Sequence, residues 1–467
     1  MMEYNQLFGY KFVYCRAYST ITLTSNILSI VLYNCINIII FVECSRQNVY
    51  ILKYKNSIKI LCGEKLIKRE LYLNQIERMI DKEPVKIITG VRRSGKTYLL
   101  KSIQEELENR GIKKENIFLI SFESMKYNKI ENFKQLDECI MKLTENTKGK
   151  VYLLFDEIQN VENWEKSINA CRVDLDCDIY ITGSNSELLS GEMATLISGR
   201  YYQINIYPFS FAEFIQYKKE IEKTDTSDLE ELFKEYVEYG GMPPIQQVAA
   251  QDKYSYLSDI YNTILLKDIV TRHNIRNTDM LNRILDYVIM NLGKKFSAGN
   301  IANYIKHERR KISKDTILDY LLYSKNACFI HQAQREDIKG KKVLKHNEKY
   351  FLVDHGFYQA KYGEIENMGS ILENIVYIEL LRRGYDVKIG RINEKEIDFV
   401  CTRDKEKIYI QVTYQLESDK TIEREFSGLA KINDNFDKYV LSMDKMDFSG
   451  SGLKHRNIID FLTSDYI

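Results

Sequence analysis

The chain alternates between helical and strand-like spacing of apolar residues from about residue 66 onward. The segment LYLNQIERMI has helical apolar spacing, and VKIITG, which follows Pro84, is a short β-branched run typical of a buried strand. An amphipathic helical pattern, TYLLKSIQEELENRG, comes next and ends at Gly111. Two further apolar runs, VYLLF and CDIYITG, have the length of buried strands. This alternation predicts an α/β core with a parallel sheet over residues 66–240.

Glycine and proline mark the end of this core. The cluster YGGMPP at 239–244 contains two glycines and two of the four prolines in the chain, and these residues interrupt regular structure. Helical spacing resumes in YSYLSDIYNTILLKDIVTRHNI. We therefore predict a hinge and then a helical lid over residues 241–280. The alternative is a helical bundle that only fills space.

Residues 281–360 combine helical patterns, two strand patterns and basic clusters. Three helices, the third with Ser313 as a good N-cap, precede two strands joined by a basic turn, an order that resembles a winged helix. Positive charge collects in KHERRKISK and KGKKVLKH, where such a module would meet DNA phosphates. The alternative is a module that docks or packs against protein, with solvated charges. The candidate DNA contacts are Arg309, Arg310, Lys311, Lys341 and Lys342.

The N-terminal extension, residues 1–65, has a different pattern. No charge occurs over residues 17–42, and ILSIVLYNCINIIIFV approaches the length of a membrane span, although asparagines interrupt it. The extension is predicted to be dispensable or to associate with a membrane through residues 21–42. The stretch LIKRELYL at Leu66 looks like a natural chain start, so an upstream start codon could account for everything before it.

Composition narrows the class of protein. A chain of 467 residues is too long for one ordinary core, so several domains are expected. The formal net charge is +1, which gives no global field for nucleic acid, so such binding would rest on local patches. Nine cysteines occur without a CxxC pair, which argues against a zinc ribbon or a disulfide framework. Scattered single thiols suit a reducing compartment, and we expect a cytoplasmic protein.

The strongest chemical signal is a phosphate-binding loop between the first strand and the helix after it. The run GVRRSGKT places two glycines, a lysine and a threonine in the G-x4-G-K-[ST] pattern. Glycines let the backbone turn its N–H groups inward, and the positive end of the helix faces the anion. Lysine would reach the β- and γ-phosphates, and threonine would bind Mg²⁺. The predicted nucleotide contacts are Gly90, Val91, Arg92, Arg93, Ser94, Gly95, Lys96, Thr97 and Tyr98.

An acidic pair ends the strand VYLLF. Asp156 is expected to join Thr97 in binding Mg²⁺, and Glu157 to act as the base that polarises the attacking water. Any strand can end in two acids, but at this distance from a phosphate loop the pair predicts nucleotide hydrolysis.

Polar residues after the next strand are candidates for sensing the γ-phosphate. Asn185 and Ser184 are the first choices and Thr182 a weaker one, while a simple turn is the alternative. Arg200, just before another strand, could stabilise transition-state charge in its own chain or in a neighbouring subunit. A solvated arginine is the alternative.

Several of these segments together resemble one family. The runs ITGVRRSGKTYLL, LLFDEIQNVENWEKSI, ITGSNSELLSG, SGRYYQINIYPFSFAEF and YGGMPPI look like the AAA+-related P-loop ATPases of bacteria and archaea that carry a nuclease-like C-terminal region. The resemblance covers about residues 66–467. It implies a nucleoside-triphosphate-hydrolysing domain with the strand order of that superfamily, and ATP and Mg²⁺ as cofactors. It implies no biological role.

Residues 361–467 resemble the PD-(D/E)xK nuclease core, as a small α/β domain. Glu373 lies on a predicted helix and Asp398 on a strand, as the metal-binding carboxylates of that core would. Gln411 and Thr413 stand where an acidic residue and a lysine are expected. An amide and a hydroxyl make a poor Mg²⁺ site, so we expect the fold without cleavage activity.

Two functions remain open for the whole chain. In one, ATP hydrolysis is coupled to engagement of DNA or a partner by the C-terminal domains. In the other, the protein is a nucleotide-dependent signalling switch that binds a protein partner without DNA. A small-molecule kinase is a weaker third, because such enzymes rarely carry long appended domains. The number of subunits is not predicted.

Overall fold

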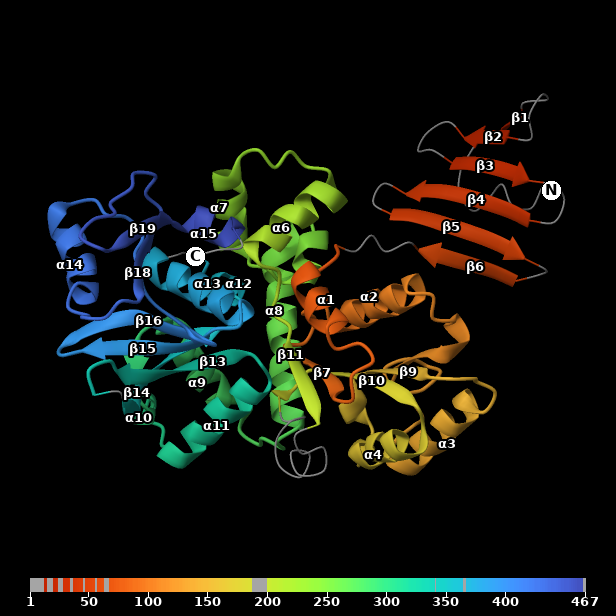
Figure 1. Ribbon diagram of the computed structural model, residues 1–467, viewed down its shortest axis with the longest axis horizontal. Coiled ribbons are helices and arrows are strands. Elements are labelled where there is room, and N and C mark those ends of the chain that lie inside the picture. The colour runs from red at the N-terminus through yellow and green to blue at the C-terminus, as the bar shows by residue number, and fades with distance from the viewer. Residues whose placement is uncertain are drawn as a thin grey trace. The chain divides into compact units, whose positions relative to one another are not determined.

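The computed structural model describes residues 67–186, 200–340, 342–363 and 367–464, and the backbone of six strands between residues 12 and 62 (Figure 1). Side chains before residue 67 and at 342–347 are outside the description. The chain divides into two units, Met1–Ile67 and Lys68–Ile467.

The first unit is one antiparallel sheet whose strands follow sequence order. Its strands are β1 (Phe12–Tyr14), β2 (Thr20–Leu23), β3 (Leu28–Tyr33), β4 (Asn37–Cys44), β5 (Gln47–Tyr54) and β6 (Ser57–Cys62). The side chains of the predicted membrane-associated segment, 21–42, lie outside the described residues. Within the described part of the chain, no helix has both the length and the apolar character needed to cross a membrane.

The second unit begins with the predicted parallel sheet. Five strands pair in the order β11-β7-β10-β9-β8, all parallel (Figure 1). The strands are β7 (Val85–Thr89), β8 (Ile117–Ser121), β9 (Val151–Asp156), β10 (Cys177–Gly183) and β11 (Tyr201–Asn205). Because β10 lies between β7 and β9, the phosphate loop and the acidic pair follow strands that are two positions apart.

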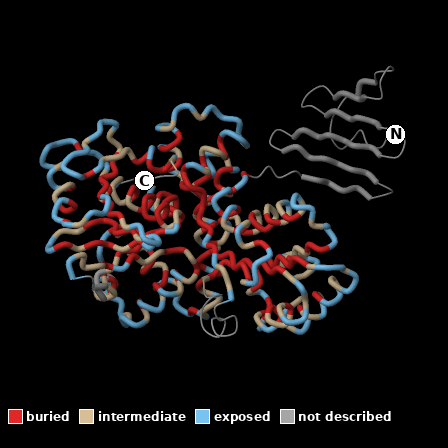
Figure 2. Tube along the Cα trace, viewed as in Figure 1, coloured by how far each residue is buried: buried red, intermediate tan, exposed pale blue. Residues whose placement is uncertain are grey.

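Alternation along these strands builds a three-layer core. Ile87 of β7 packs in one apolar cluster with α3 and α4, while its neighbour Ile88 packs in a second cluster with α1 and α2. Figure 2 shows the strands as the most buried part of this region. The helices are α1 (Glu70–Glu77), α2 (Lys96–Asn109), α3 (Phe133–Thr144) and α4 (Trp164–Asp174), with short 3₁₀ turns η2 (Lys114–Asn116) and η3 (Ile158–Asn160).

Helices follow β11, and those after the glycine and proline cluster were predicted from the apolar spacing. They are α6 (Phe211–Tyr217), η5 (Lys218–Glu222), α7 (Leu229–Tyr239), η6 (Pro243–Gln247), η7 (Ala250–Asp252), α8 (Lys253–Thr263) and η8 (Ile264–Thr271). The predicted hinge is closely packed: Gly240 has φ 73°, and a Cβ there would lie 1.9 Å from Oδ1 of Asp354. The N–H of Gly241 donates to Oδ2 of the same carboxylate at 2.8 Å. These glycines therefore allow close approach of the C-terminal half.

The rest of the unit is built on one mixed sheet of order β12-β14-β13-β15-β16-β17-β18-β19. Its β13 pairs antiparallel with β14 and parallel with β15, so strands from the predicted winged-helix and nuclease-like segments share one sheet. The strands are β12 (Lys295–Phe296), β13 (Ile330–Asp337), β14 (Lys342–Leu352), β15 (Asp386–Ile392), β16 (Lys395–Arg403), β17 (Glu406–Val412), β18 (Asp437–Ser442) and β19 (Lys454–Asn457).

Helices accompany this sheet, and one apolar cluster extends through most of the region from Tyr207 to Leu462. They are α9 (Thr278–Met290), α10 (Ala298–His307), α11 (Lys314–Asn326), α12 (Gly356–Tyr362), α13 (Met368–Arg382), α14 (Asp419–Leu429) and α15 (Ile458–Thr463). Ser313 caps α11 by accepting from the N–H of Thr316, as its residue type predicted. The predicted divisions at residues 240, 280 and 360 stay predictions.

Candidate nucleotide-binding site

The loop between β7 and α2 is shaped by its two glycines. A Cβ on Gly90 would lie 2.3 Å from the carbonyl oxygen of Ile206, which only glycine can accommodate. Gly95 has φ 103° and begins α2 as its N-cap. Nζ of Lys96 donates to the carbonyl oxygens of Gly90 at 3.1 Å and Val91 at 3.2 Å. The lysine is therefore folded back over the loop whose N–H groups would face phosphate.

The two predicted magnesium ligands touch each other. Oγ1 of Thr97 lies 3.1 Å from both carboxylate oxygens of Asp156. The hydroxyls of Thr182, at 2.8 Å, and Ser121, at 3.1 Å, donate to the same carboxylate. Burial raises the pKa of Asp156, with a contribution from the charge of Glu157, and the three hydroxyls oppose that rise. One carboxylate and one hydroxyl suit Mg²⁺, which keeps water and phosphate oxygens in its shell.

The buried side chain of Glu157 faces the loop lysine. Its Oε1 lies 3.4 Å from Nζ of Lys96, and its Oε2 accepts a hydrogen bond from Gln159. The backbone is left-handed at φ 55°, and the N–H of Glu157 donates to Oγ1 of Thr182 at 3.0 Å. Burial alone would raise its pKa, but Lys96, Gln159 and Arg92 outweigh burial and hold it below the ordinary value. The group is therefore ionised, as a base requires.

Hydrogen bonds to Asp268 connect the phosphate loop and the end of β10 to η8. Oγ of Ser184 donates to Oδ1 of Asp268 at 3.1 Å, and Nε of Arg92 donates to Oδ2 of the same residue at 2.9 Å. Asp268 lies on η8, within the predicted lid. Asn185 is also buried, directly after β10 at the same edge of the sheet. The predicted polar residues after β10 therefore lie at the edge where the loop lies.

Nothing in the sequence indicated the role of Arg69, which donates to the backbone of the phosphate loop. Its guanidinium donates to the carbonyl oxygens of Ser94 at 3.0 Å and Tyr207 at 2.9 Å, and it forms an ion pair with Glu213 at 2.7 Å. Arg69 precedes α1, and nothing in the local pattern distinguishes it from the neighbouring charged residues. Ser121 was also missed. Its position at the end of a parallel strand was a usable signal, because such ends share one edge.

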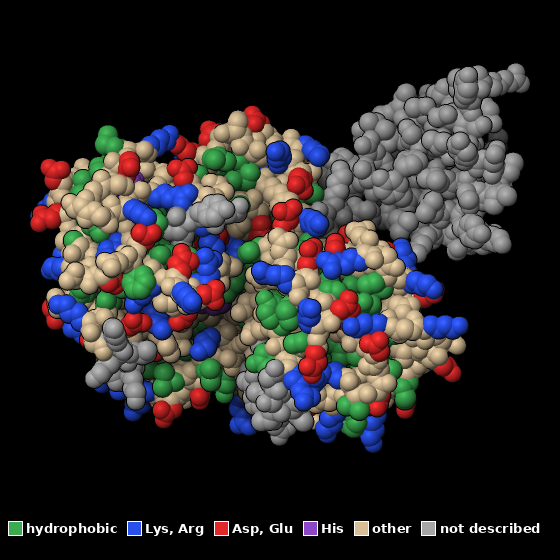
Figure 3. Space-filling model, viewed as in Figure 1, with side chains coloured by type: hydrophobic (Ala, Val, Ile, Leu, Met, Phe, Trp, Pro, Cys, Tyr) green, Lys and Arg blue, Asp and Glu red, His purple; other side chains and the backbone are tan. Residues whose placement is uncertain are grey.

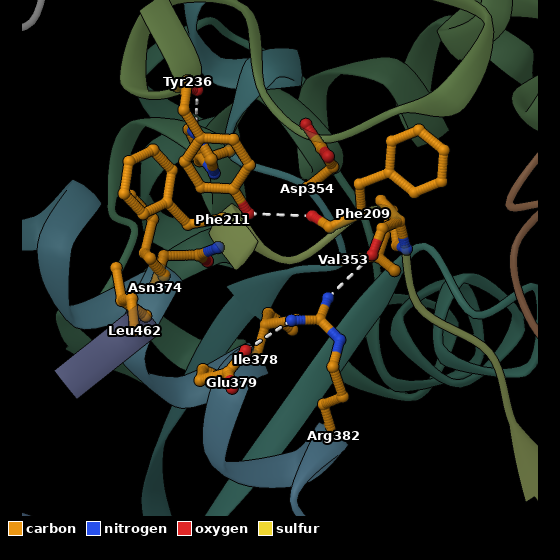
Figure 4. A pocket seen from close by; sticks show the side chains of 13 residues that line it. Phe209, Phe211, Tyr236, Val353, Asp354, Asn374, Ile378, Glu379, Arg382 and Leu462 are labelled. Carbon is orange, nitrogen blue, oxygen red and sulfur yellow. Dashed lines mark hydrogen bonds and ion pairs between the residues drawn. The ribbon is translucent and has the colours of Figure 1, made fainter. Parts of the chain in front are cut away.

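The segment after β11 also contacts the C-terminal helices. The carbonyl oxygen of Pro208 accepts from Arg382 of α13 at 2.7 Å and from Arg69 at 3.4 Å. Figure 4 shows Arg382 directed toward this segment beside a small cavity lined also by Tyr236, whose hydroxyl donates to the carbonyl oxygen of Phe209 at 2.9 Å. Arg69 and Arg382 thus both donate to the carbonyl oxygen of Pro208.

The structure does not bring Arg200 to this site within one chain. Its carbonyl oxygen accepts from the N–H of Val85, at the start of β7, whereas the loop follows the end of that strand. The side chain is 64% exposed and lies 4.0 Å from Glu83. A residue before a parallel strand lies at the amino-terminal edge of the sheet, and this corrects the prediction for a role within the same chain.

The predicted DNA contacts are partly described. Arg309, Arg310 and Lys311 are exposed, and Arg310 forms an ion pair with Asp279 of α9. Lys341 lies outside the described residues, as does the side chain of Lys342. On the face shown in Figure 3, acidic and basic side chains are interspersed.

Comparison with known proteins places the chain in a family. Residues 82–215 match an AAA domain, and residues 230–384 match a domain of unknown function (DUF8612). An uncharacterized protein of Haemophilus influenzae is 40% identical over 378 residues, covering 81% of this chain and 93% of that protein. An uncharacterized protein of Methanocaldococcus jannaschii is 32% identical over 390 residues, covering 80% of this chain and 83% of that protein.

A solved structure of the Orc1 protein of Aeropyrum pernix in complex with DNA has 12% identity and a TM-score of 0.32, covering 65% of this chain and 94% of that chain. A likeness this distant carries no argument about function. The five-stranded parallel sheet and its loop form a P-loop α/β core within the matched AAA domain. The chain therefore belongs to the family that includes the Haemophilus and Methanocaldococcus proteins, and its residues 82–215 match an AAA domain.

Proposed function

We propose that this protein binds and hydrolyses ATP with Mg²⁺ at the loop after β7. The observation that carries the proposal is that the start of α2 contacts the end of β9: Thr97 lies against Asp156, and Lys96 lies against Glu157. Phosphate recognition and water activation both need groups at one sheet edge, and these four residues come from segments about sixty positions apart.

Each side chain has a part in the proposed reaction. Lys96 would exchange its contact with Glu157 for phosphate oxygens, which frees the carboxylate to accept a proton from the attacking water. Thr97 and Asp156 would hold Mg²⁺, which would supply charge stabilisation on the phosphates. The buried hydroxyl of Ser94 has no protein partner in the loop and is a further candidate phosphate donor.

Two variants test the assignment. Lys96→Ala should lose tight ATP binding, and Glu157→Gln should bind ATP while its turnover falls by about 100-fold or more, the effect expected when a general base is removed. Glu162→Gln is the matched control, because this acid is exposed and lies five residues further along the chain. Equal turnover by wild type and Glu157→Gln would refute the base.

The coupled role is proposed for the C-terminal half. The order α9, β12, α10, α11, β13 and β14, with β12 pairing to β14, supports a winged-helix domain, and the order from α13 to β18 supports a PD-(D/E)xK-like fold. We propose that ATP turnover is coupled to engagement of DNA or a partner by this half. DNA should then stimulate ATP hydrolysis, and the stimulation should fade with added salt.

A specific observation favours a protein partner as the second candidate. The exposed face of α11 presents Leu318, 52% exposed, and Leu322, 47% exposed, one helical turn apart. DNA-binding helices present polar side chains to phosphates and base edges, whereas an apolar pair suits protein contact. Turnover that ignores DNA, with ATP-dependent capture of a partner that Leu318→Ser abolishes, would favour the switch.

A further inference from the structure

A buried lysine lies among the carboxylates of the nuclease-like segment. Nζ of Lys349, on β14, lies 3.0 Å from Oε2 of Glu373 on α13, 3.1 Å from Oε1 of Glu396 and 3.7 Å from Oδ1 of Asp398, both on β16. The lysine side chain is only 3% exposed. Its ammonium therefore has a carboxylate oxygen within ion-pair distance in three directions.

The remaining ligand positions near this lysine are also occupied by protein groups. Oδ2 of Asp398 accepts from the N–H of Val412 at 2.9 Å. The amide oxygen of Gln411 accepts from the N–H of Asp398, and its amide nitrogen donates to Glu425 at 3.0 Å. Gln411 is thus hydrogen-bonded at both the oxygen and the nitrogen of its amide.

A divalent ion does not fit this arrangement. An ion shared by Glu373 and Asp398 would need to lie within about 2.6 Å of an oxygen of each, in the space that the ammonium of Lys349 fills. Two cations so close would repel each other strongly in a buried site. Consistent with this, no group of three or more His, Cys, Asp or Glu side chains in the described part of the chain is arranged to hold a metal ion.

The charge of the lysine is maintained by its surroundings. Burial alone would lower the pKa of Lys349, but Glu373 and Asp398 outweigh burial and raise it. Burial and the charge of Asp398 raise the pKa of Glu373, and burial raises the pKa of Asp398 as well. Lys295 supplies a second ammonium at the edge of this cluster, through an ion pair with Glu396.

We propose that Lys349 is a built-in cation that stands where the resembled nuclease fold would hold a divalent metal ion. The cluster is then a network of ion pairs without a metal ion, and it links β14 of the winged-helix-like part to α13 and β16 of the C-terminal part. This deepens the expectation of an inactive site, because it names the group that takes the metal's place.

The test uses full-length protein and Mn²⁺ alone as the probe, followed by electron paramagnetic resonance. All variants carry Asp156→Asn, so that the proposed ATPase site gives no signal and its failure cannot be confused with failure here. We expect no Mn²⁺ binding with Lys349 present, and binding at least about tenfold tighter in Lys349→Ala, because Glu373 and Asp398 then lack the ammonium beside them, whereas Glu396 keeps its ion pair with Lys295. Adding Glu373→Gln should remove the gained site.

Lys349→Arg is the matched control, since it keeps the charge and should bind no Mn²⁺. Binding of Mn²⁺ by the protein with Lys349 intact would overturn the proposal, and this measurement does not depend on any Lys349 variant being folded. A folded Lys349→Ala variant that binds no Mn²⁺ would contradict it equally. So would Mn²⁺-dependent plasmid cleavage that is lost in Lys349→Ala, because the lysine would then serve a metal-using site.

Discussion

Replacement of Arg69 by methionine should damage both stability and nucleotide binding, for separable reasons. The guanidinium is buried and pairs with Glu213, whose side chain is 12% exposed. It also donates to the carbonyl oxygens of Ser94 in the phosphate loop and Tyr207 after β11. Methionine fills similar space but supplies neither the charge nor the donors.

The magnitude follows from what the substitution leaves behind. Removing one partner of a buried ion pair costs about 3–5 kcal/mol of stability, because the other charge stays buried without compensation. The lost donor to the Ser94 carbonyl oxygen is worth about 1–3 kcal/mol, which corresponds to roughly 5- to 150-fold in ATP affinity if the loop loses its shape. Arg110→Met is the control: this arginine is exposed and its surface ion pairs contribute about 0–1 kcal/mol.

A double variant separates the two effects. Arg69→Met with Glu213→Gln removes the unpaired charge, so chemical denaturation should show that part of the stability returns. Nucleotide titration should still show weakened ATP binding, because the Ser94 carbonyl oxygen still lacks its donor. If ATP affinity recovers together with stability in the double variant, Arg69 only supports the fold and does not position the loop.

Two further outcomes are expected. Gly90→Ala should abolish ATP binding, since its Cβ would lie 2.3 Å from the Ile206 carbonyl oxygen; calorimetric titration of a variant with native circular dichroism checks this. Burial lowers the pKa of His331 to about 4, so the unfolded state takes up a proton as pH falls below about 6.5 while the folded state does not. The contribution of His331 to the free energy of unfolding is therefore present in full above about pH 6.5, and it falls by about 2 kcal/mol by pH 5. In His331→Phe, the free energy of unfolding should fall by about 2 kcal/mol less than in wild type between about pH 6.5 and pH 5. If it falls by the same amount in the variant and in wild type, the prediction is wrong.

The phosphate-loop residues could be proposed from the sequence because their arrangement is local or follows from sheet geometry. The spacing of Gly90, Gly95, Lys96 and Thr97 sets the loop, and the structure gives it the expected strand–loop–helix context. Asp156 could be placed near it because carboxyl ends of parallel strands share one edge. The same rule, applied to the residue before β11, would have excluded Arg200 from this edge within one chain.

Long-range ionic partners could not be read from the pattern. Arg92 forms a hydrogen bond with Asp268, which is 176 residues away in the sequence, and Arg69 does so with Glu213, which is 144 residues away. Nothing in amphipathic spacing distinguishes a charged residue that will be buried and paired from one that stays in water. Lys349 is the clearest case, since its partners belong to a segment that we expected to be a separate domain.

The segment from Tyr207 to Phe209 offers a physical basis for the proposed coupling. The phosphate loop is tied to it through Arg69, and α13 is tied to it through Arg382, with the carbonyl oxygen of Pro208 accepting from both arginines. If the loop closed on phosphate and shifted the Ser94 carbonyl oxygen, the planar guanidinium of Arg69 would pass the shift to the backbone that also accepts from Arg382. Coupling by this route needs no mobile lid. The segment is buried and fully hydrogen-bonded, so a displacement at one end would break hydrogen bonds or packing contacts unless the other end moved with it.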